Sequence, residues 1–206
     1  MTTTEARSAA AGPACTIDPD GWCDRARRLP SPNFDARPHG VAADLLVIHN
    51  ISLPPGQFGG AYIEGLFTNT LDHDAHPYFE QLRPLRVSAH FLIRRDGELL
   101  QFVSANARAW HAGVSQFAGR ERCNDFSIGI ELEGSDFVPF EAAQYQSLAA
   151  LTLALQRRYR LAWVAGHEHV APGRKTDPGP CFDWPAYQKL CSAEMECGRL
   201  SFTMLA

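Results

Sequence analysis

Short apolar runs separated by turn residues indicate where the strands of this chain lie. Residues 45–49 (LLVIH) form a continuous apolar run, typical of a central strand, that ends on a histidine. Residues 126–133 (FSIGIELE) alternate apolar residues with polar or small ones, which is the period of a strand with two different faces. Residues 161–164 (LAWV) are a further apolar run. These runs predict three strands.

A hairpin and three helices complete the predicted elements. The hairpin strands, residues 88–94 and 98–103, flank Asp96-Gly97, a pair favoured in tight turns that need positive φ. Helices are predicted over residues 61–67, 141–160 and 184–191. The longest places one buried face at spacings of three and four: Tyr145, Leu148, Thr152, Leu155 and Tyr159. This order predicts an α/β (mixed α+β) fold, a single domain with a central mixed β-sheet flanked by helices.

The ends of the chain and two internal segments lack a regular pattern. Residues 1–20 are expected to form a disordered tail that is rich in alanine and threonine at its start. Residues 21–191 are expected to form the domain, which leaves 192–206 as a C-terminal tail with no assigned role. Within the domain, 21–44 is expected to be an extended lead-in and 68–86 a long surface loop. Loops of that length in compact domains tend to be functional.

Composition narrows the class of protein. The chain has 206 residues, 45% hydrophobic and 20% charged, as an ordinary globular domain does. A formal charge of -4 and the lack of a basic run argue against nucleic acid as a partner. No apolar stretch approaches the roughly 20 residues that a bilayer requires. The start lacks the apolar centre of a secretory signal, so we expect a cytoplasmic protein, and we expect it to act as a monomer.

One loop collects the most reactive side chains. Residues 166–180 (GHEHVAPGRKTDPGP) carry histidine, lysine and aspartate between three glycines and three prolines, which restrict the path of the backbone. With His49 at the end of its predicted strand, His167 and Asp177 make a three-ligand set that fits zinc with a fourth position open. The residues therefore predict a metal-dependent hydrolase. His169 and Cys181 are rival ligands, and His49 taken alone would more often be a core histidine that donates to a backbone carbonyl.

Two further residues have a functional and a plain interpretation. Glu131 and Glu133 lie two apart on a predicted strand, so they share a face. They either face solvent as a pair, or Glu131 faces the metal site and takes a proton from water, with Gly129 leaving space for a ligand. Lys175 is either a solvated loop lysine or a group that stabilises an oxyanion. The other histidines, among them His111, have no assigned role.

Seven segments carry a resemblance to a known family: 45–55 (LLVIHNISLPP), 58–60 (FGG), 76–79 (HPYF), 86–90 (RVSAH), 108–114 (RAWHAGV), 120–134 (RERCNDFSIGIELEG) and 174–180 (RKTDPGP). In this order they resemble the zinc amidases related to peptidoglycan-recognition domains. Within that family they are similar to the cytoplasmic amidases that act on 1,6-anhydro-N-acetylmuramyl peptides in peptidoglycan recycling. The resemblance covers residues 21 to 190 and implies the fold of these amidases.

The resemblance also implies roles for single residues. It favours one zinc ion per chain, bound by His49, His167 and Asp177, with Glu131 as catalytic carboxylate and Lys175 as transition-state stabiliser. It implies substrate contacts at four positions: Asn50, Arg86, Trp110 and Arg122. The expected substrate is an anhydro-muramyl peptide, cut between the lactyl carbonyl and L-alanine. Two alternatives stay open: a muropeptide-binding module without activity, and an exported cell-wall amidase of the same fold.

Overall fold

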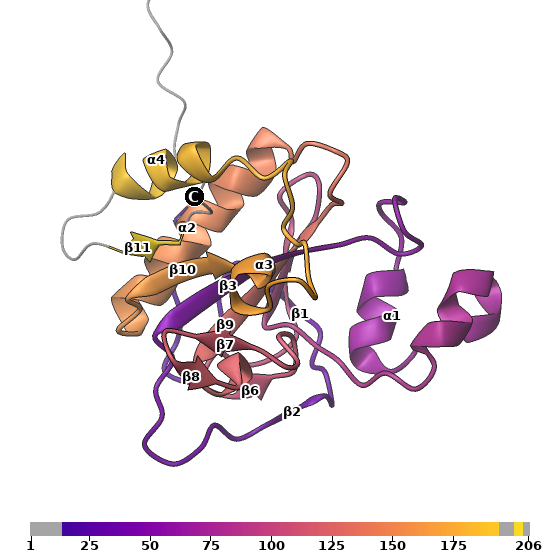
Figure 1. Ribbon diagram of the computed structural model, residues 1–206, viewed down its shortest axis with the longest axis horizontal. Helices are drawn as coiled ribbons and strands as arrows, with labels where there is room; N and C mark the ends of the chain where they lie inside the picture. Colours follow the sequence, from indigo (N-terminus) through magenta and orange to yellow (C-terminus); the bar gives the residue numbers. More distant parts are fainter. Residues whose placement is uncertain (1–13, 194–199, 204–206) are drawn as a thin grey trace, which may run out of the picture.

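A computed structural model describes residues 14–193 and 200–203 of the chain. Its centre is a seven-stranded sheet in the order β1-β5-β4-β9-β3-β10-β11 (Figure 1). All neighbouring strands in it are parallel except β4 and β5, which are antiparallel, so the predicted mixed sheet is confirmed. Its strands are β1 (Arg27–Arg28), β5 (Leu99–Gln101), β4 (Phe91–Ile93), β9 (Ser127–Glu133), β3 (Leu45–Ile51), β10 (Trp163–Gly166) and β11 (Ser201–Phe202).

Helices and short ribbons surround this sheet. The two longest helices, α2 (Ala142–Arg158) and α4 (Trp184–Ala193), lie together on one face, and α1 (Tyr62–Thr68) lies at the other end of the molecule (Figure 1). The short helices are α3 (His167–Val170), η1 (His73–Ala75), η2 (Pro77–Leu82) and η3 (Cys123–Asp125). Two antiparallel ribbons pair β2 (Phe34–Asp35) with β6 (Arg108–Ala109), and β7 (Gln116–Phe117) with β8 (Arg120–Glu121).

The sheet separates two kinds of packing. On the side of α2 and α4, a large apolar cluster includes Leu46, Ile48, Ile128, Ile130 and Leu132, all fully buried. The alternate residues of the same strands point to the opposite side because side chains on a strand alternate between faces. That opposite side is covered by smaller apolar clusters around α1, η2 and α3. Polar side chains are buried between these clusters.

The predicted elements are confirmed at their centres, and most differences lie at their ends. The predicted hairpin forms as β4 and β5, although each strand is shorter than the pattern suggested. The segment 68–86 is not a plain loop, because it contains η1 and η2. The predicted helix 141–160 forms as α2, and four of its five expected face residues are buried: Tyr145, Leu148, Thr152 and Leu155.

Several short elements were not predicted. The strands β1, β2, β6, β7, β8 and β11 each have two residues, too few to give a periodic pattern. The turn-rich loop after β10 opens with a short helix, α3, instead of remaining irregular. None of the described helices combines the length and the apolar character needed to cross a bilayer.

Both chain ends contribute to the packing more than expected. Of the predicted tail 1–20, residues 14–20 are described, and Cys15 is buried in the large apolar cluster while Ile17 pairs with Cys23. Near the other end, Leu200 is buried and β11 extends the sheet beside β10. The packed part of the chain therefore begins before residue 21 and includes residues beyond 191. Residues 1–13, 194–199 and 204–206 lie outside the described residues.

Candidate metal centre

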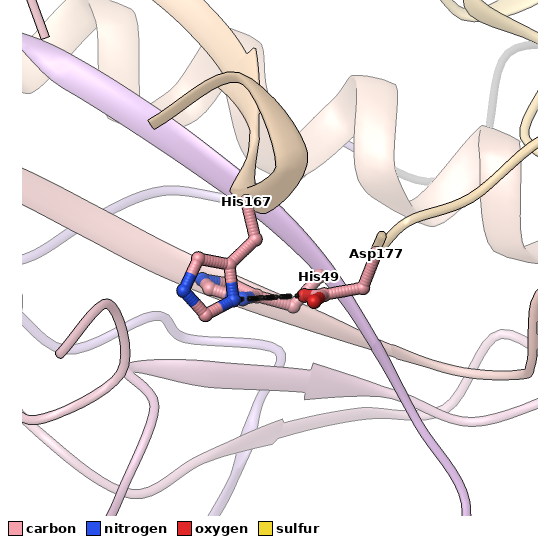
Figure 2. A group of neighbouring side chains, drawn as sticks. All are labelled: His49, His167 and Asp177. Atoms are coloured by element: carbon pink, nitrogen blue, oxygen red, sulfur yellow. Dashed lines mark hydrogen bonds and ion pairs between the residues drawn. The ribbon is translucent and has the colours of Figure 1, made fainter. Parts of the chain in front are cut away.

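Three elements bring His49, His167 and Asp177 together, as Figure 2 shows. His49 lies near the carboxyl end of β3, and His167 begins α3 directly after β10. Strand β10 pairs with β3 in parallel, and Gly166 lies opposite Ile48. His167 follows Gly166 and His49 follows Ile48, so the two histidines lie side by side. Asp177 comes from the following loop, whose carbonyl at this residue accepts a hydrogen bond of 2.8 Å from the Glu168 amide.

The ligand atoms of these residues converge tightly. His49 Nδ1 lies 3.0 Å from His167 Nδ1, and Asp177 Oδ2 lies 2.9 Å from the first nitrogen and 3.0 Å from the second. This is the one group of metal-ligating side chains found among the described residues. The three residues that the sequence singled out are thus neighbours in space, although 118 positions separate the two histidines.

The protonation pattern of His167 leaves its metal-side nitrogen free. Its Nε2 lies 3.0 Å from the carbonyl oxygen of Ala112, and a carbonyl can only accept, so Nε2 carries the proton. In the neutral ring, Nδ1 is then a bare acceptor that faces another imidazole nitrogen and a carboxylate oxygen. Converging acceptors repel one another unless a shared proton or a metal cation lies among them. The site is therefore built as a cation receptor.

The electrostatics favour the ionisation states that a metal needs. Burial, followed by the neighbouring His167, lowers the pKa of His49 to about 4, which keeps its ring neutral. Burial opposes ionisation of Asp177, but the imidazoles of His167 and His49 still hold the pKa of its carboxyl below the usual range. A neutral imidazole and an ionised carboxylate are the forms that bind zinc.

Glu131 lies beside this group with no partner for one oxygen. It sits opposite His49 in the register of β3 and β9, and only 9% of its surface is exposed. Its Oε2 is buried and has no hydrogen-bond partner among the described residues. Burial, and then the charge of Asp177, raise the pKa of Glu131 well above its usual value, although Lys175 opposes the shift. An unpaired buried carboxylate is poised to take up a proton.

Glu133 differs from Glu131 although both lie on the same strand and face. It accepts hydrogen bonds from Arg94 at 2.9 Å and from the Gly59 amide at 2.6 Å. Its surface is 2% exposed, so the interpretation of both glutamates as a solvent-facing pair is wrong. One carboxylate is fully satisfied by structural partners, and the other is left free beside the metal ligands.

A cleft of about 370 Å³ opens over the site, and some of the residues predicted from the sequence line it while others do not. Its walls include Glu131 and the three ligands, together with Asn50, Trp110 and the exposed Lys175. The Asn50 amide is already used inside the protein, donating to Asp136 Oδ1 at 2.8 Å and to the Pro178 carbonyl at 3.0 Å.

The two arginines predicted as substrate contacts lie elsewhere. The Arg86 guanidinium donates to the carbonyls of Arg83 and Leu85 and does not line the cleft. The Arg122 side chain is 70% exposed and lies along a separate surface hollow beside Arg174. In this conformation neither guanidinium reaches the metal ligands.

The rival ligands have other surroundings. His169 Nδ1 accepts a hydrogen bond of 2.7 Å from the Gly166 amide, so its ring caps the start of α3. Cys181 is not part of the converging group. The choice between His167 and His169 could not come from the H-x-H spacing alone. It depends on the turn of helix that directs one ring inward and the other toward the backbone.

The sequence interpretation missed His111, whose Nδ1 lies 2.9 Å from His49 Nε2. It also explained Gly129 wrongly. A Cβ at Gly129 would overlap the ring of His111, so the missing side chain makes room for this histidine and not for a ligand. A histidine next to a glycine-bearing strand gives no local pattern, and only the fold shows that the two residues touch.

Comparison with known proteins agrees with this geometry. A family model described as "N-acetylmuramoyl-L-alanine amidase" matches residues 39–180. The chain is 59% identical over 176 residues to the 1,6-anhydro-N-acetylmuramyl-L-alanine amidase AmpD of Escherichia coli, covering 84% of this chain and 96% of that protein.

Solved structures give the same picture. A crystal structure of a selenomethionine AmpD derivative matches with a TM-score of 0.81 and 58% identity, covering 84% of this chain and 98% of the other. The E. coli amidase AmiD, solved with the substrate anhydro-N-acetylmuramic acid-L-Ala-D-γ-Glu-L-Lys, matches with a TM-score of 0.52 and 29% identity. That match covers 84% of this chain and 65% of AmiD.

Proposed function

Because this chain belongs to the N-acetylmuramoyl-L-alanine amidase family, we propose that it is a zinc-dependent muropeptide amidase. The bond cut is the amide between the lactyl group of 1,6-anhydro-N-acetylmuramic acid and L-alanine. One observation carries the proposal: two histidines and an aspartate converge beside Glu131, a buried carboxylate with a free oxygen. The similarity to AmpD supports the choice of the anhydro sugar.

The donor set fits zinc. Two imidazole nitrogens and one carboxylate oxygen are ligands that zinc accepts, and three protein ligands leave a fourth position for the reaction. Their mutual distances of 2.9 to 3.0 Å lie near the edge of a tetrahedron with bonds of about 2.0–2.1 Å, roughly 3.3 Å. When bound, zinc supplies Lewis acidity, which polarises a carbonyl and lowers the pKa of water to about 7.

Glu131 is assigned the proton transfers. In the reaction, the oxygen of water bonds to the lactyl carbonyl carbon, and the bond from that carbon to the alanine nitrogen breaks. Glu131 Oε2 accepts the proton that water gives up and returns it to the nitrogen, so that the peptide leaves with a free amine and the lactyl group becomes a carboxylic acid. The raised pKa of Glu131 suits a carboxylate that must hold this proton between the two steps.

Lys175 is assigned the charge that develops on the carbonyl oxygen. Its exposed side chain lines the cleft, and its charge acts on both Glu131 and His49. An ammonium aimed at a developing oxyanion lowers the barrier to attack. Trp110 and Asn50 form part of the cleft wall, where a sugar or peptide would bind. Contacts from Arg86 and Arg122 to the carboxylates of the peptide stay predictions.

The proposed setting is the recycling of cell-wall fragments in the cytoplasm, with the protein acting as a monomer. The proposed substrate joins the anhydro sugar to a peptide stem, as in the muropeptide bound to AmiD. An enzyme of this specificity would separate the two parts and leave each for reuse. This setting rests on the similarity to AmpD amidases.

The test compares the parent protein with Asp177→Ala, measuring zinc content and hydrolysis of anhydro-muramyl tripeptide. We expect one zinc per chain and release of the intact tripeptide, seen by mass spectrometry. Asp177→Ala should lose the zinc, and its rate should fall by about 10³-fold or more, since several kcal/mol of stabilisation is removed. Asp74→Ala is the control, because that carboxylate is 90% exposed and outside the cleft.

Two outcomes would contradict the proposal. Cleavage only between amino acids of the stem would assign the protein to another class of peptidase. Tight muropeptide binding by zinc-loaded parent protein without hydrolysis would make it a binding module.

A further inference from the structure

We propose that His111 is a positioning residue that selects the tautomer of His49 and so presents Nδ1 of that ring to the metal. This inference rests on the zinc site of the proposed function. It adds a role for a histidine that does not converge with the three ligands. The role concerns the side of the His49 ring that faces away from the metal.

The geometry fixes which nitrogen of His49 is involved. His49 Nδ1 points at the other two ligands, and His49 Nε2 lies 2.9 Å from His111 Nδ1. On its far side, His111 Nε2 lies 3.2 Å from the hydroxyl of Ser127. A ligand histidine usually donates its remaining N–H to an outer partner, which fixes both ring orientation and tautomer. His111 occupies that position for His49.

The chain of contacts can run in two directions, and one of them leaves His49 Nδ1 free for the metal. If His111 Nε2–H donates to the Ser127 hydroxyl, then His111 Nδ1 is an acceptor and His49 Nε2–H donates to it. His49 Nδ1 is then left unprotonated for the metal. In the opposite direction, Ser127 Oγ–H donates to His111 Nε2, and His111 Nδ1–H donates to His49 Nε2. His49 Nδ1–H then faces Asp177 Oδ2 at 2.9 Å, and this proton would have to leave before a metal could bind.

The adjacent residue does the same for the second histidine. The carbonyl of Ala112 accepts from His167 Nε2 at 3.0 Å and from the Arg174 guanidinium at 2.7 Å. Residues 111–112 therefore contact the outer nitrogen of both ligand histidines. This segment is itself fixed, because the amides of His111 and Ala112 donate to Asn124 Oδ1 at 3.2 and 2.8 Å.

The strand beneath is shaped for this ring. A side chain at Gly129 would overlap the His111 imidazole, and no other residue type leaves the ring in its place. The His111 ring also meets His49 edge to face, with centroids 5.0 Å apart. Packing alone could be provided by any flat apolar side chain, whereas the contact between the two nitrogens requires an acceptor at the position of Nδ1.

The test separates the acceptor from the packing. His111→Leu removes the acceptor, and His111→Asn keeps an oxygen near the position of Nδ1. Zinc affinity is measured by competition with a chelator, and thermal unfolding of the metal-free proteins monitors the fold. We expect His111→Leu to bind zinc about 10- to 100-fold more weakly than the parent, and His111→Asn to stay within about threefold. Ser127→Ala should give a smaller loss than His111→Leu.

A second readout needs no variant. In the metal-free parent, nitrogen NMR of the His49 ring should show the proton on Nε2. A proton on Nδ1 would overturn the proposal, and so would equal zinc affinities of His111→Leu and the parent. Equal losses in His111→Leu and His111→Asn would also overturn it, since packing would then explain both. Failure of the parent to bind zinc would instead refute the proposed function, while the tautomer would still report on His111.

Discussion

The two faces of the central sheet are built from the same strands, yet they do different work. On β9, Ile128, Ile130 and Leu132 pack into the apolar cluster beneath α2 and α4. The residues between them, Glu131 among them, point to the other face, where buried polar groups surround the cleft. One face holds the fold together, and the other concentrates polar groups whose burial costs stability.

This contrast shows how alternation along a strand can place chemistry on a rigid support. His49 and Ile48 are neighbours in sequence, but one lies in the metal centre and the other in the apolar core. The ligand is therefore held by a strand whose opposite face is fully packed. Substitutions on the apolar face should accordingly affect stability alone. On the polar face, a substitution should affect activity where the side chain is free in the cleft, and stability where it has structural partners.

The largest effect that would sharpen this contrast is expected for Glu131→Gln. The amide has nearly the same shape but cannot accept and return a proton, so the rate should fall by about 10²- to 10⁴-fold. Zinc content and unfolding temperature should stay close to those of the parent, because the carboxylate has a free oxygen and few structural partners. Steady-state kinetics with anhydro-muramyl tripeptide would measure the loss, and a rate within a factor of ten of the parent would contradict this role.

Glu133→Ala should behave in the opposite way, two residues further along the same face. It removes one of two carboxylates that pair with the buried Arg94 guanidinium, at 2.9 Å, and leaves Glu64 at 2.7 Å. Breaking a buried pair costs up to about 3–5 kcal/mol of unfolding free energy. Denaturant unfolding would measure this loss. Protein that remains folded and zinc-loaded should retain most of its rate per active site. A large loss of rate with unchanged stability would mean that Glu133 also belongs to the catalytic groups.

The sequence predicted the apolar face of the sheet better than the polar face. The apolar face of β9 and the buried face of α2 follow from periods of two and about four residues, so they could be identified locally. The ligands His49 and Asp177 could be named from spacing and resemblance. The different fates of Glu131 and Glu133 could not, because the partner that occupies Glu133, Arg94, lies on another segment of the chain.

The same limit applies to the groups around the ligands. The contact of His111 with His49 depends on the path of the chain between them, which no short pattern specifies. Two-residue strands such as β11 form only because a longer strand, β10, is already in place beside them. Local sequence predicts an element where the periodic pattern of that element is enough to bury one of its faces. It does not predict an element or a contact that forms only because a distant segment packs against it.

Ile130→Ala would test the apolar face next. Ile130 is fully buried between the neighbouring strands and the helices, and truncation leaves a cavity that costs about 2–5 kcal/mol of unfolding free energy. The side chain points away from the cleft, so the rate of the folded, zinc-loaded protein should change little at 25 °C. Paired unfolding and kinetic measurements would show this. A tenfold loss of rate would mean that packing on this face also positions Glu131.

His90→Asn addresses the pH dependence of the polar face. His90 is fully buried, its Nδ1 accepts from the Gly129 amide at 3.0 Å, and its Nε2 lies 3.2 Å from the Ala107 carbonyl. Burial, followed by the charge of Arg37, lowers the pKa of His90 to about 3. Both contacts suit the neutral ring, because protonating Nδ1 would remove the acceptor of the Gly129 amide.

The direction in which pH changes the stability follows from the pKa of His90 in the folded and unfolded states. The folded pKa lies below the unfolded value of about 6.5, so the stabilisation is complete above that pH and is lost as pH falls toward 3. Between pH 7 and 5 this residue alone should cost the parent about 2 kcal/mol. The Asn oxygen can accept from Gly129 without titrating, so metal-free His90→Asn should lose about 2 kcal/mol less than metal-free parent over this range. Equal losses in denaturant unfolding would refute this source of acid sensitivity.

The smallest effect is expected where the apolar face contains a polar pair of its own. Tyr187 on α4 is fully buried, and its hydroxyl lies 2.6 Å from the Thr152 hydroxyl on α2. Tyr187→Phe removes one partner and should cost about 1 kcal/mol, or roughly 2–4 °C in Tm for a chain of this size, with no change in rate. Adding Thr152→Val removes the stranded hydroxyl as well, so the double variant should be no less stable than Tyr187→Phe. If the double variant were clearly less stable, the Thr152 hydroxyl would have a further structural partner. If either variant lowered the rate, then the packing of α2 against α4 would also affect catalysis, and the apolar face would not act on stability alone.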